Sequence, residues 1–238
     1  MTNFPKFSFA FQPIVNASIG KVVSYEALVR GINDTPASDI FQKIDEKDKY
    51  IFDELLRIKA VELAAAAGLQ CSLNLNFLPQ SLENSNDTIS TTLKAAEQHG
   101  IKLDRIVIEL TETEIIRDIA LFAQKMSLYR STGVTVSIDD FGAGYSGLNL
   151  LAQFLPDQIK IDMSLIRHIH LNGPRQAIVR GVIRTCLDLG IDILAEGVET
   201  EDEYSWCFNE GIDIFQGYFF GKPLFEKLGQ VNFDNQIH

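Results

Sequence analysis

The sequence predicts an α/β chain whose strands close into a (β/α)8 barrel, with one strand antiparallel to the rest. Short β-branched runs alternate with longer amphipathic stretches along the chain. The first two runs are joined by a connection too short for a parallel pair. Alternating strands and helices are typical of a mostly parallel sheet, and eight strands in 238 residues fit a closed barrel.

The predicted strands are runs rich in Val, Ile and other strand-forming residues. They occupy residues 8–15, 21–29, 71–76, 105–111, 134–139, 158–162, 191–196 and 213–219. Amphipathic helices are predicted at residues 47–67, 88–99, 121–132, 175–189 and 201–209. An open doubly wound sheet is the alternative, but no glycine-rich phosphate fingerprint opens its first helix. No linker interrupts the pattern, so residues 1–238 are expected to form a single domain.

The connection between the first two strands determines their direction. It consists only of residues 16–20, Asn-Ala-Ser-Ile-Gly. A parallel pair needs a crossover of about a dozen residues or more, whereas so short a connection allows a hairpin if the two strands pair directly. We therefore expect an antiparallel first strand in an otherwise parallel barrel.

The composition excludes several classes of protein. Hydrophobic residues make up 46% of the chain, which suffices for a sizeable core and is too high for disorder. The chain has 21 Lys and Arg residues but 32 Asp and Glu residues, and the resulting net charge of −11 disfavours binding to a nucleic-acid polymer. No stretch is apolar enough to span a bilayer and the first residues lack a signal-peptide pattern, so no membrane insertion is expected. The three cysteines provide neither a disulfide framework nor a CxxC metal site, which favours a cytoplasmic location.

Polar residues fall on one face of several predicted strands. Between Ser72 and Asn76, for example, the leucines share one face and the polar residues share the other. The polar faces bring seven residues toward the barrel mouth: Glu26, Asn74, Glu109, Asp139, Lys160, Glu196 and Gln216. Most of them lie near the C-terminal ends of their strands, where barrel enzymes place their chemistry.

This polar set favours divalent cations. Clustered carboxylates repel one another unless they are protonated or bound to cations. No His or Cys joins the set, so Zn²⁺ is a poor match, and oxygen ligands favour Mg²⁺ or Mn²⁺. The adjacent residues Asp139 and Asp140 suggest a bridging carboxylate and a second ion. Two such ions suit the in-line attack of water on a phosphodiester.

Seven motifs follow one another along the chain. They are Glu26-Ala27-Leu28 with Arg30, Asn74-Leu75-Asn76, Glu109-Leu110-Thr111-Glu112, Asp139-Asp140-Phe141-Gly142, Lys160-Ile161-Asp162, Glu196-Gly197-Val198-Glu199 and Gln216-Gly217-Tyr218. In order and spacing this set resembles the EAL-domain family, close to the EAL domains often paired with blue-light flavin sensors. The resemblance covers nearly the whole chain.

The resemblance implies a fold, an activity and a set of metal ligands. The fold is a modified TIM (β/α)8 barrel with an antiparallel first strand. The activity is hydrolysis of cyclic di-GMP to linear 5′-pGpG with two Mg²⁺ or Mn²⁺ ions, and Ca²⁺ is expected to inhibit. The first ion would be held by Glu26, Asn74, Glu109 and Asp139, and Asp139 would bridge to a second ion beside Asp140.

The resemblance also implies roles for the remaining site residues. Lys160 and Glu196 would hold or activate the attacking water, with either as the general base, and Gln216 would order water at the metals. Gln12, Arg30 and Glu199 would contact the dinucleotide, and Glu112 would anchor the loop after Asp140. A homodimer is expected by resemblance alone.

Two other functions stay open at the level of sequence. A non-catalytic EAL module would bind the dinucleotide or a protein without cleavage. Such members usually lack several acidic residues, whereas this chain keeps them. Another Mg²⁺-dependent barrel enzyme, such as one that handles enolates, would fit the carboxylates but not the motif set.

Overall fold

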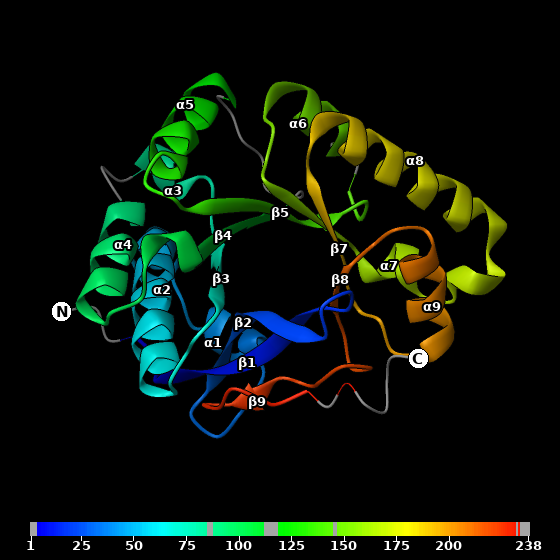
Figure 1. The fold of residues 1–238 in the computed structure, drawn as a ribbon. Coiled ribbons are helices and arrows are strands. Elements are labelled where there is room, and N and C mark those ends of the chain that lie inside the picture. Colours follow the sequence, from blue (N-terminus) through cyan, green and yellow to red (C-terminus); the bar gives the residue numbers. More distant parts are fainter. Residues whose placement is uncertain (1–3, 85–87, 112–118, 145–146, 232, 234–238) are drawn as a thin grey trace.

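The strands of the protein form a closed barrel with helices on its outside (Figure 1). The structure is a computed structural model that describes residues 4–84, 88–111, 119–144, 147–231 and 233. The sheet order is β2-β3-β4-β5-β6-β7-β8-β1, and β1 also pairs with β2, which closes the ring. The predicted (β/α)8 barrel is therefore confirmed.

The barrel strands follow the predicted runs closely. They are β1 (Phe7–Asn16), β2 (Lys21–Gly31), β3 (Ser72–Phe77), β4 (Ile106–Thr111), β5 (Thr135–Phe141), β6 (Gln158–Ile161), β7 (Asp192–Ala195) and β8 (Ile214–Gln216). A short strand β9 (Leu224–Phe225), which was not predicted, pairs with β1 outside this ring.

The five predicted helices are present, together with shorter ones. The predicted helices are α2 (Lys49–Ala66), α4 (Thr88–Gln98), α5 (Ile119–Arg130), α8 (Gly173–Leu189) and α9 (Glu201–Asn209). The additional α-helices are α1 (Ala37–Phe41), α3 (Ser81–Asn84), α6 (Gly147–Gln153) and α7 (Met163–Ile166). In the described part of the chain, single turns of 3-10 helix are η1 (Glu46–Asp48), η2 (Leu103–Arg105) and η3 (Ile169–Leu171). The additional elements are too short to show a helical period in the sequence.

Strand β1 is antiparallel to β2, as the short connection predicted, and also to β8, its other neighbour in the ring. Its register with β2 places Gln12 opposite Glu26. Its register with β8 places Ile14 opposite Gln216. The hairpin closes at Gly20, whose φ of 59° lies in the left-handed region that glycine adopts without strain. This hairpin brings Gln12, Glu26 and Gln216 to adjacent strands.

Local signals in the sequence define the ends of two outer helices. Helix α9 begins with a capping box, in which the Thr200 side chain accepts from the backbone of Glu203 and the Glu203 side chain accepts from the backbone of Thr200. Helix α8 begins after Asn172, whose side chain accepts from the backbone of Arg175, and ends at Gly190 in the left-handed conformation. These caps satisfy backbone groups that would otherwise lack partners at the helix ends.

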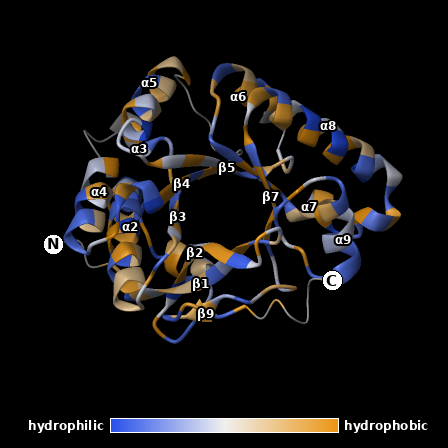
Figure 2. Ribbon diagram, viewed as in Figure 1, coloured by the Kyte–Doolittle hydropathy of each residue, from blue (hydrophilic) through white to orange (hydrophobic). Residues whose placement is uncertain are grey.

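The main hydrophobic core lies between the barrel and its helices. Outward-facing side chains such as Leu73, Leu75, Ile106 and Ile108 are fully buried there. Each contributes about 1.5–3 kcal/mol through burial. Figure 2 shows both hydrophobic and hydrophilic residues along α2 and α8, as expected for helices that turn one face to the barrel. Among the described residues, no helix has the length and apolar character needed to cross a membrane.

A buried ion pair joins two turns of α2. Arg57 and Asp53 have side chains only 1% and 8% exposed, and Arg57 also donates to Thr92 on α4. We expect Arg57→Met to lower the free energy of unfolding by about 3–5 kcal/mol, because it leaves the Asp53 charge buried without this partner. Urea denaturation measures the loss. The matched control is Arg184→Met, since Arg184 forms a pair of the same spacing with Asp188 on the exposed face of α8 and should matter little. Equal losses in the two variants would contradict this account.

Candidate active site at the barrel mouth

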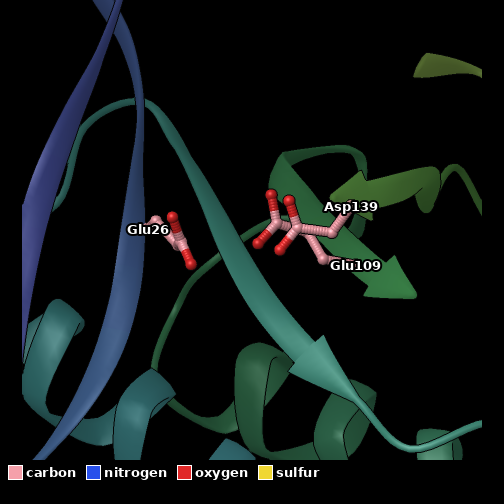
Figure 3. Close-up of side chains that lie close together, drawn as sticks. All are labelled: Glu26, Glu109 and Asp139. Carbon is pink, nitrogen blue, oxygen red and sulfur yellow. The ribbon is translucent and has the colours of Figure 1, made fainter. Parts of the chain in front are cut away.

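The polar residues predicted on the strand faces meet inside one end of the barrel. Each comes from a different strand, and strand alternation turns its side chain inward. They are Glu26 on β2, Asn74 on β3, Glu109 on β4, Asp139 on β5, Lys160 on β6 and Gln216 on β8, with Glu196 directly after β7. Figure 3 shows Glu26, Glu109 and Asp139 close together. The site is thus assembled from residues that lie far apart in the sequence.

Lys160 lies at the centre of this site and is fully buried. Its Nζ is 2.6 Å from Glu196 Oε1, 2.9 Å from Glu109 Oε1, 3.0 Å from Asp139 Oδ1 and 3.4 Å from Glu26 Oε2. A buried ammonium is costly unless it is paired, and here four carboxylates pair with it. The site therefore holds more negative than positive charge even with Lys160 protonated.

Two groups of carboxylates have oxygens close enough to share a cation. One contains Glu26, Glu109 and Asp139, and the other contains Asp139, Asp140 and Glu196. Within each group the candidate ligand atoms lie within 4.8 Å of one another. Asp139 belongs to both groups, which is the arrangement expected of a carboxylate that bridges two metal ions. In addition, Glu109 Oε2 is buried and has no hydrogen-bond partner in the described part of the chain. A buried carboxyl oxygen without a partner in this position fits a divalent cation.

Side-chain amides orient the carboxylates. Asn74 Nδ2 donates to Glu109 Oε1 at 2.7 Å, and Asn76 Nδ2 donates to Glu26 Oε1 at 3.3 Å. Gln216 Nε2 donates to Glu26 Oε2 at 2.6 Å and to Gln12 Oε1 at 3.2 Å. These contacts fix the rotamers of two predicted metal ligands, as the outer contacts of metal sites commonly do.

A local irregularity in β5 accounts for two adjacent aspartates at the site. The pairing of β5 with β6 shifts register between Ile138 and Phe141, which marks a bulge. Asp140 has a φ of 54°, a left-handed conformation that is uncommon outside glycine and that aspartate tolerates better than most residues. In a regular strand Asp139 and Asp140 would face opposite sides. The bulge lets both contribute to one carboxylate group.

Gly217 holds Gln216 beside the segment that carries Glu196. A Cβ at position 217 would lie 2.0 Å from the carbonyl oxygen of Val198, so only glycine fits. The close approach is fixed by backbone hydrogen bonds from Val198 N to Gln216 O at 3.1 Å and from Phe219 N to Val198 O at 3.0 Å. Close packing against Val198 therefore explains why glycine follows Gln216 in the motif.

Burial and charge act in opposite directions on Glu109 and Lys160. Burial, together with the charges of Glu26 and Asp139, raises the pKa of Glu109 to about 8, although Lys160 and Asn74 act to lower it. Burial alone would lower the pKa of Lys160, but the surrounding carboxylates outweigh it, and the pKa lies well above its usual value. Lys160 is consequently an ammonium at neutral pH, whereas Glu109 retains its proton in the absence of a bound cation.

The pKa values of two residues in the second carboxylate group are also raised. Burial and the neighbouring charges of Asp139 and Asp162 raise the pKa of Asp140 to about 6. Burial also raises the pKa of Glu196 well above its usual value, despite the opposing effect of Lys160. Carboxyl groups with raised pKa values are typical of sites that transfer protons or bind metal ions.

These shifts predict how metal affinity depends on pH. A carboxyl group must lose its proton to bind a cation, and Glu109 carries one below pH 8. We expect the affinity for Mn²⁺ to rise roughly tenfold per pH unit between pH 6 and pH 8 and then to level off. Titration calorimetry in buffers of different ionisation enthalpy would also detect proton release at pH 7. Constant affinity over this range, with no proton release, would contradict the assignment of Glu109 as a ligand.

The residues predicted to contact substrate lie at or near the mouth. Gln12 donates to Gly221 O at 3.1 Å while it accepts from Gln216. Arg30 Nη1 donates to the carbonyl oxygen of Val29, and Arg30 Nε lies 3.6 Å from Asp34 Oδ1. Glu199 is paired with Arg167 at 2.7 Å and is 43% exposed. Glu112, the predicted loop anchor, lies outside the described residues.

Two further contacts of the site have no role predicted from the motifs, and the first of them is buried. Ser24, on the same face of β2 as Glu26, donates to Asn74 Oδ1. Asn76, the last residue of the Asn-Leu-Asn motif, donates to Glu26 Oε1. Strand alternation places both side chains on the inward faces and could have identified them. Their hydrogen-bond partners depend on the strand register, which the sequence alone does not specify.

Comparison with known proteins places the chain in a family. The EAL domain matches residues 4–223 of this chain. The chain belongs to the EAL-domain family. This match confirms the resemblance that the seven motifs indicated.

Curated relatives of the EAL domain are longer proteins. It is 36% identical over 226 residues to the blue light- and temperature-regulated antirepressor BluF of Escherichia coli (strain K12), covering 94% of this chain and 56% of BluF. It is 30% identical over 216 residues to the cyclic di-GMP phosphodiesterase PdeR of the same strain, covering 86% of this chain and 32% of PdeR. The chain thus spans about half of BluF and a third of PdeR.

Solved structures share the same fold. A standalone versatile EAL protein from Vibrio cholerae O395, in its c-di-GMP bound form, superposes with a TM-score of 0.93 at 42% identity, covering 98% of this chain and 99% of that one. The manganese and cyclic di-GMP complex of BlrP1 from Klebsiella pneumoniae at pH 6 has a TM-score of 0.89 at 40% identity, covering 97% of this chain and 59% of BlrP1. BlrP1 is also known as a calcium and cyclic di-GMP complex. The modified barrel is therefore the fold of this family.

Proposed function

We propose that this EAL domain is a phosphodiesterase that hydrolyses cyclic di-GMP to 5′-pGpG with the help of two divalent cations. The proposal rests on the two carboxylate groups that share Asp139 and surround the buried Lys160. The name of PdeR and the dinucleotide complex of the Vibrio cholerae EAL protein support the choice of substrate. A carboxylate-rich site suits an anionic phosphodiester only when cations neutralise it.

The donor set fits Mg²⁺ or Mn²⁺. Glu26, Asn74, Glu109 and Asp139 would hold one ion, and Asp139 and Asp140 would hold the other. When bound, such ions stabilise negative charge on the phosphoryl group and lower the pKa of water. The manganese complex of BlrP1 supports this choice. We propose Ca²⁺ as an inhibitor, because it prefers longer bonds and looser geometry than these two ions.

Lys160 and Glu196 act on the attacking water and the phosphodiester. Lys160 stays protonated, so it acts through its charge and stabilises the phosphoryl oxygens as negative charge develops. Glu196 has a raised pKa, which makes its carboxylate a stronger base toward the proton of the attacking water. Gln216 Oε1 is buried without a hydrogen-bond partner in the described residues, so it can accept from that water and orient it.

The rim residues bind the dinucleotide. Arg30 supplies a guanidinium to a phosphodiester oxygen, and Gln12 supplies an amide. The carboxylate of Glu199 suits the N–H donors of a guanine base.

We also propose that the chain forms a homodimer through helices near the loop that follows β5. Exposed leucines on and beside α5 and α6 support this surface: Leu121, Leu128, Leu148 and Leu155. Apolar side chains gathered on a surface are typical of an interface between proteins.

Product analysis tests the proposed activity. Purified protein is incubated with cyclic di-GMP and Mg²⁺ or Mn²⁺, and the products are separated by anion-exchange chromatography. We expect 5′-pGpG with either ion, no product with EDTA, and little product with Ca²⁺. Binding of cyclic di-GMP without any turnover would contradict the proposal.

A second function is supported by the identity of 36% to BluF, which is named an antirepressor. In that case the chain would bind a protein partner, and its site would serve as a dinucleotide receptor. The two functions differ in one readout, because a receptor binds cyclic di-GMP stoichiometrically and leaves it intact.

A further inference from the structure

Strands β2 and β3 separate from each other toward the barrel mouth. Their pairing runs only from Ser24 with Ser72 to Glu26 with Asn74. Strand β2 nevertheless continues to Gly31 and β3 continues to Phe77. On its other side, β3 stays paired with β4 as far as Phe77. The barrel wall therefore opens between β2 and β3 just beyond two proposed metal ligands.

A pocket of about 510 Å³ lies at this opening. Both strands line it, and so do α1, α2 and the chain between these helices. Its volume is within the roughly 300–1,000 Å³ typical of small-molecule sites. Most of its lining is apolar, including Phe9, Val29, Phe41, Phe52, Leu75 and Phe77. A ligand with a substantial apolar part would fit it.

One charged residue of the pocket favours an anion. The lining includes the cations Arg30, Lys49 and Arg57 and the anions Glu46 and Asp53, and the buried Asp53 pairs with Arg57. The Arg30 side chain is 23% exposed, and its contact with Asp34 is long at 3.6 Å. An anionic headgroup could therefore form a charge-assisted hydrogen bond with Arg30.

We propose that this pocket binds an amphiphilic anion, namely an aliphatic chain that ends in a carboxylate. The chain would lie among β2, β3 and α2, and the carboxylate would lie at Arg30. Burial of one methylene contributes about 0.8 kcal/mol, so each additional methylene should tighten binding about three- to fourfold. The proposed function has Arg30 contact cyclic di-GMP as well. On that basis the amphiphile should compete with cyclic di-GMP and raise its KM without changing kcat.

Displacement of a fluorescent probe tests this site without any substrate. The full chain is loaded with 1-anilinonaphthalene-8-sulfonate, and octanoate, decanoate and dodecanoate are titrated below their micellar concentrations. We expect displacement that tightens about tenfold for each pair of added methylenes. Dodecanol, which lacks the charge, should bind at least about tenfold more weakly. No displacement by dodecanoate would overturn the site, and equal affinity for dodecanol would overturn the assignment of the headgroup.

Two variants test whether the ligand binds in this pocket. Ala37→Trp fills the pocket from α1, and Phe41→Glu puts a negative charge on a residue that is 49% exposed. Each should weaken dodecanoate at least about tenfold. The matched controls are Ala66→Trp on the exposed side of α2 and Leu187→Glu on α8, which do not line the pocket and should bind as the wild type does. Unchanged binding in both pocket variants would show that the anion binds elsewhere. Because the probe reports binding directly, this result is independent of whether cyclic di-GMP is hydrolysed.

Discussion

Glu26→Ala should reduce kcat for cyclic di-GMP by about 10³-fold or more, because it removes a carboxylate that faces Lys160 and belongs to a candidate metal group. Loss of a bound cation removes several kcal/mol of charge stabilisation, and each 1.36 kcal/mol changes the rate about tenfold. The amide of Asn76 would lose its acceptor, and the amide of Gln216 would lose one of its two acceptors. Initial rates with saturating Mn²⁺, measured by chromatography of 5′-pGpG, give the effect.

Two further measurements separate a lost ligand from a damaged fold. Circular dichroism should show a folded Glu26→Ala variant, and calorimetry should show weaker Mn²⁺ binding than in the wild type. The control is Glu62→Ala, since Glu62 is 48% exposed on α2 and pairs only with Lys59 among the contacts described for it. Activity near that of the wild type in Glu26→Ala would refute this metal assignment.

Lys160→Met should lower kcat by about 10²–10³-fold, as expected when a charged group that stabilises developing negative charge is removed. It should also destabilise the metal-free protein by about 3–5 kcal/mol at pH 8, because the four carboxyl groups that pair with Lys160 would then lack its positive charge. The raised pKa of Glu109, about 8, and the raised pKa of Glu196 predict a smaller loss at pH 6 than at pH 8, because these groups bind more protons at the lower pH. Mn²⁺ should restore more stability to this variant than to the wild type.

The comparison of Lys160→Met with Glu26→Ala distinguishes a charge from a ligand. The lysine variant should retain Mn²⁺ binding, whereas the glutamate variant should lose it. Lys59→Met serves as the control, because Lys59 is 37% exposed and contacts Glu62 at the surface. If Lys160→Met were as stable as the wild type in EDTA at pH 8, the charge balance described for the site would be wrong.

Strand alternation explains why much of the site could be predicted from sequence. A period of two placed Glu109 and Asp139 on inward faces, and the strand ends placed them at one mouth. The short connection at residues 16–20 predicted the antiparallel β1, which the structure confirms. These predictions depend only on local geometry, which one sequence contains.

Other features depend on contacts between distant segments and were not predictable. A regular strand would turn Asp140 away from Asp139, and only the bulge against β6 brings both into one carboxylate group. The sequence left open whether Lys160 or Glu196 is the general base, whereas four carboxylate neighbours raise the pKa of Lys160. The opening between β2 and β3 likewise follows from where their pairing stops.

Hydrolysis in H₂¹⁸O tests the central claim, that water at this site attacks a phosphodiester of cyclic di-GMP. The product is separated after a single turnover with Mn²⁺ and analysed by mass spectrometry. The account predicts 5′-pGpG with one ¹⁸O in its terminal 5′-phosphate, and no product in EDTA. A product with an unlabelled terminal phosphate or a 3′-phosphate would contradict it, as would intact cyclic di-GMP that remains bound to the protein.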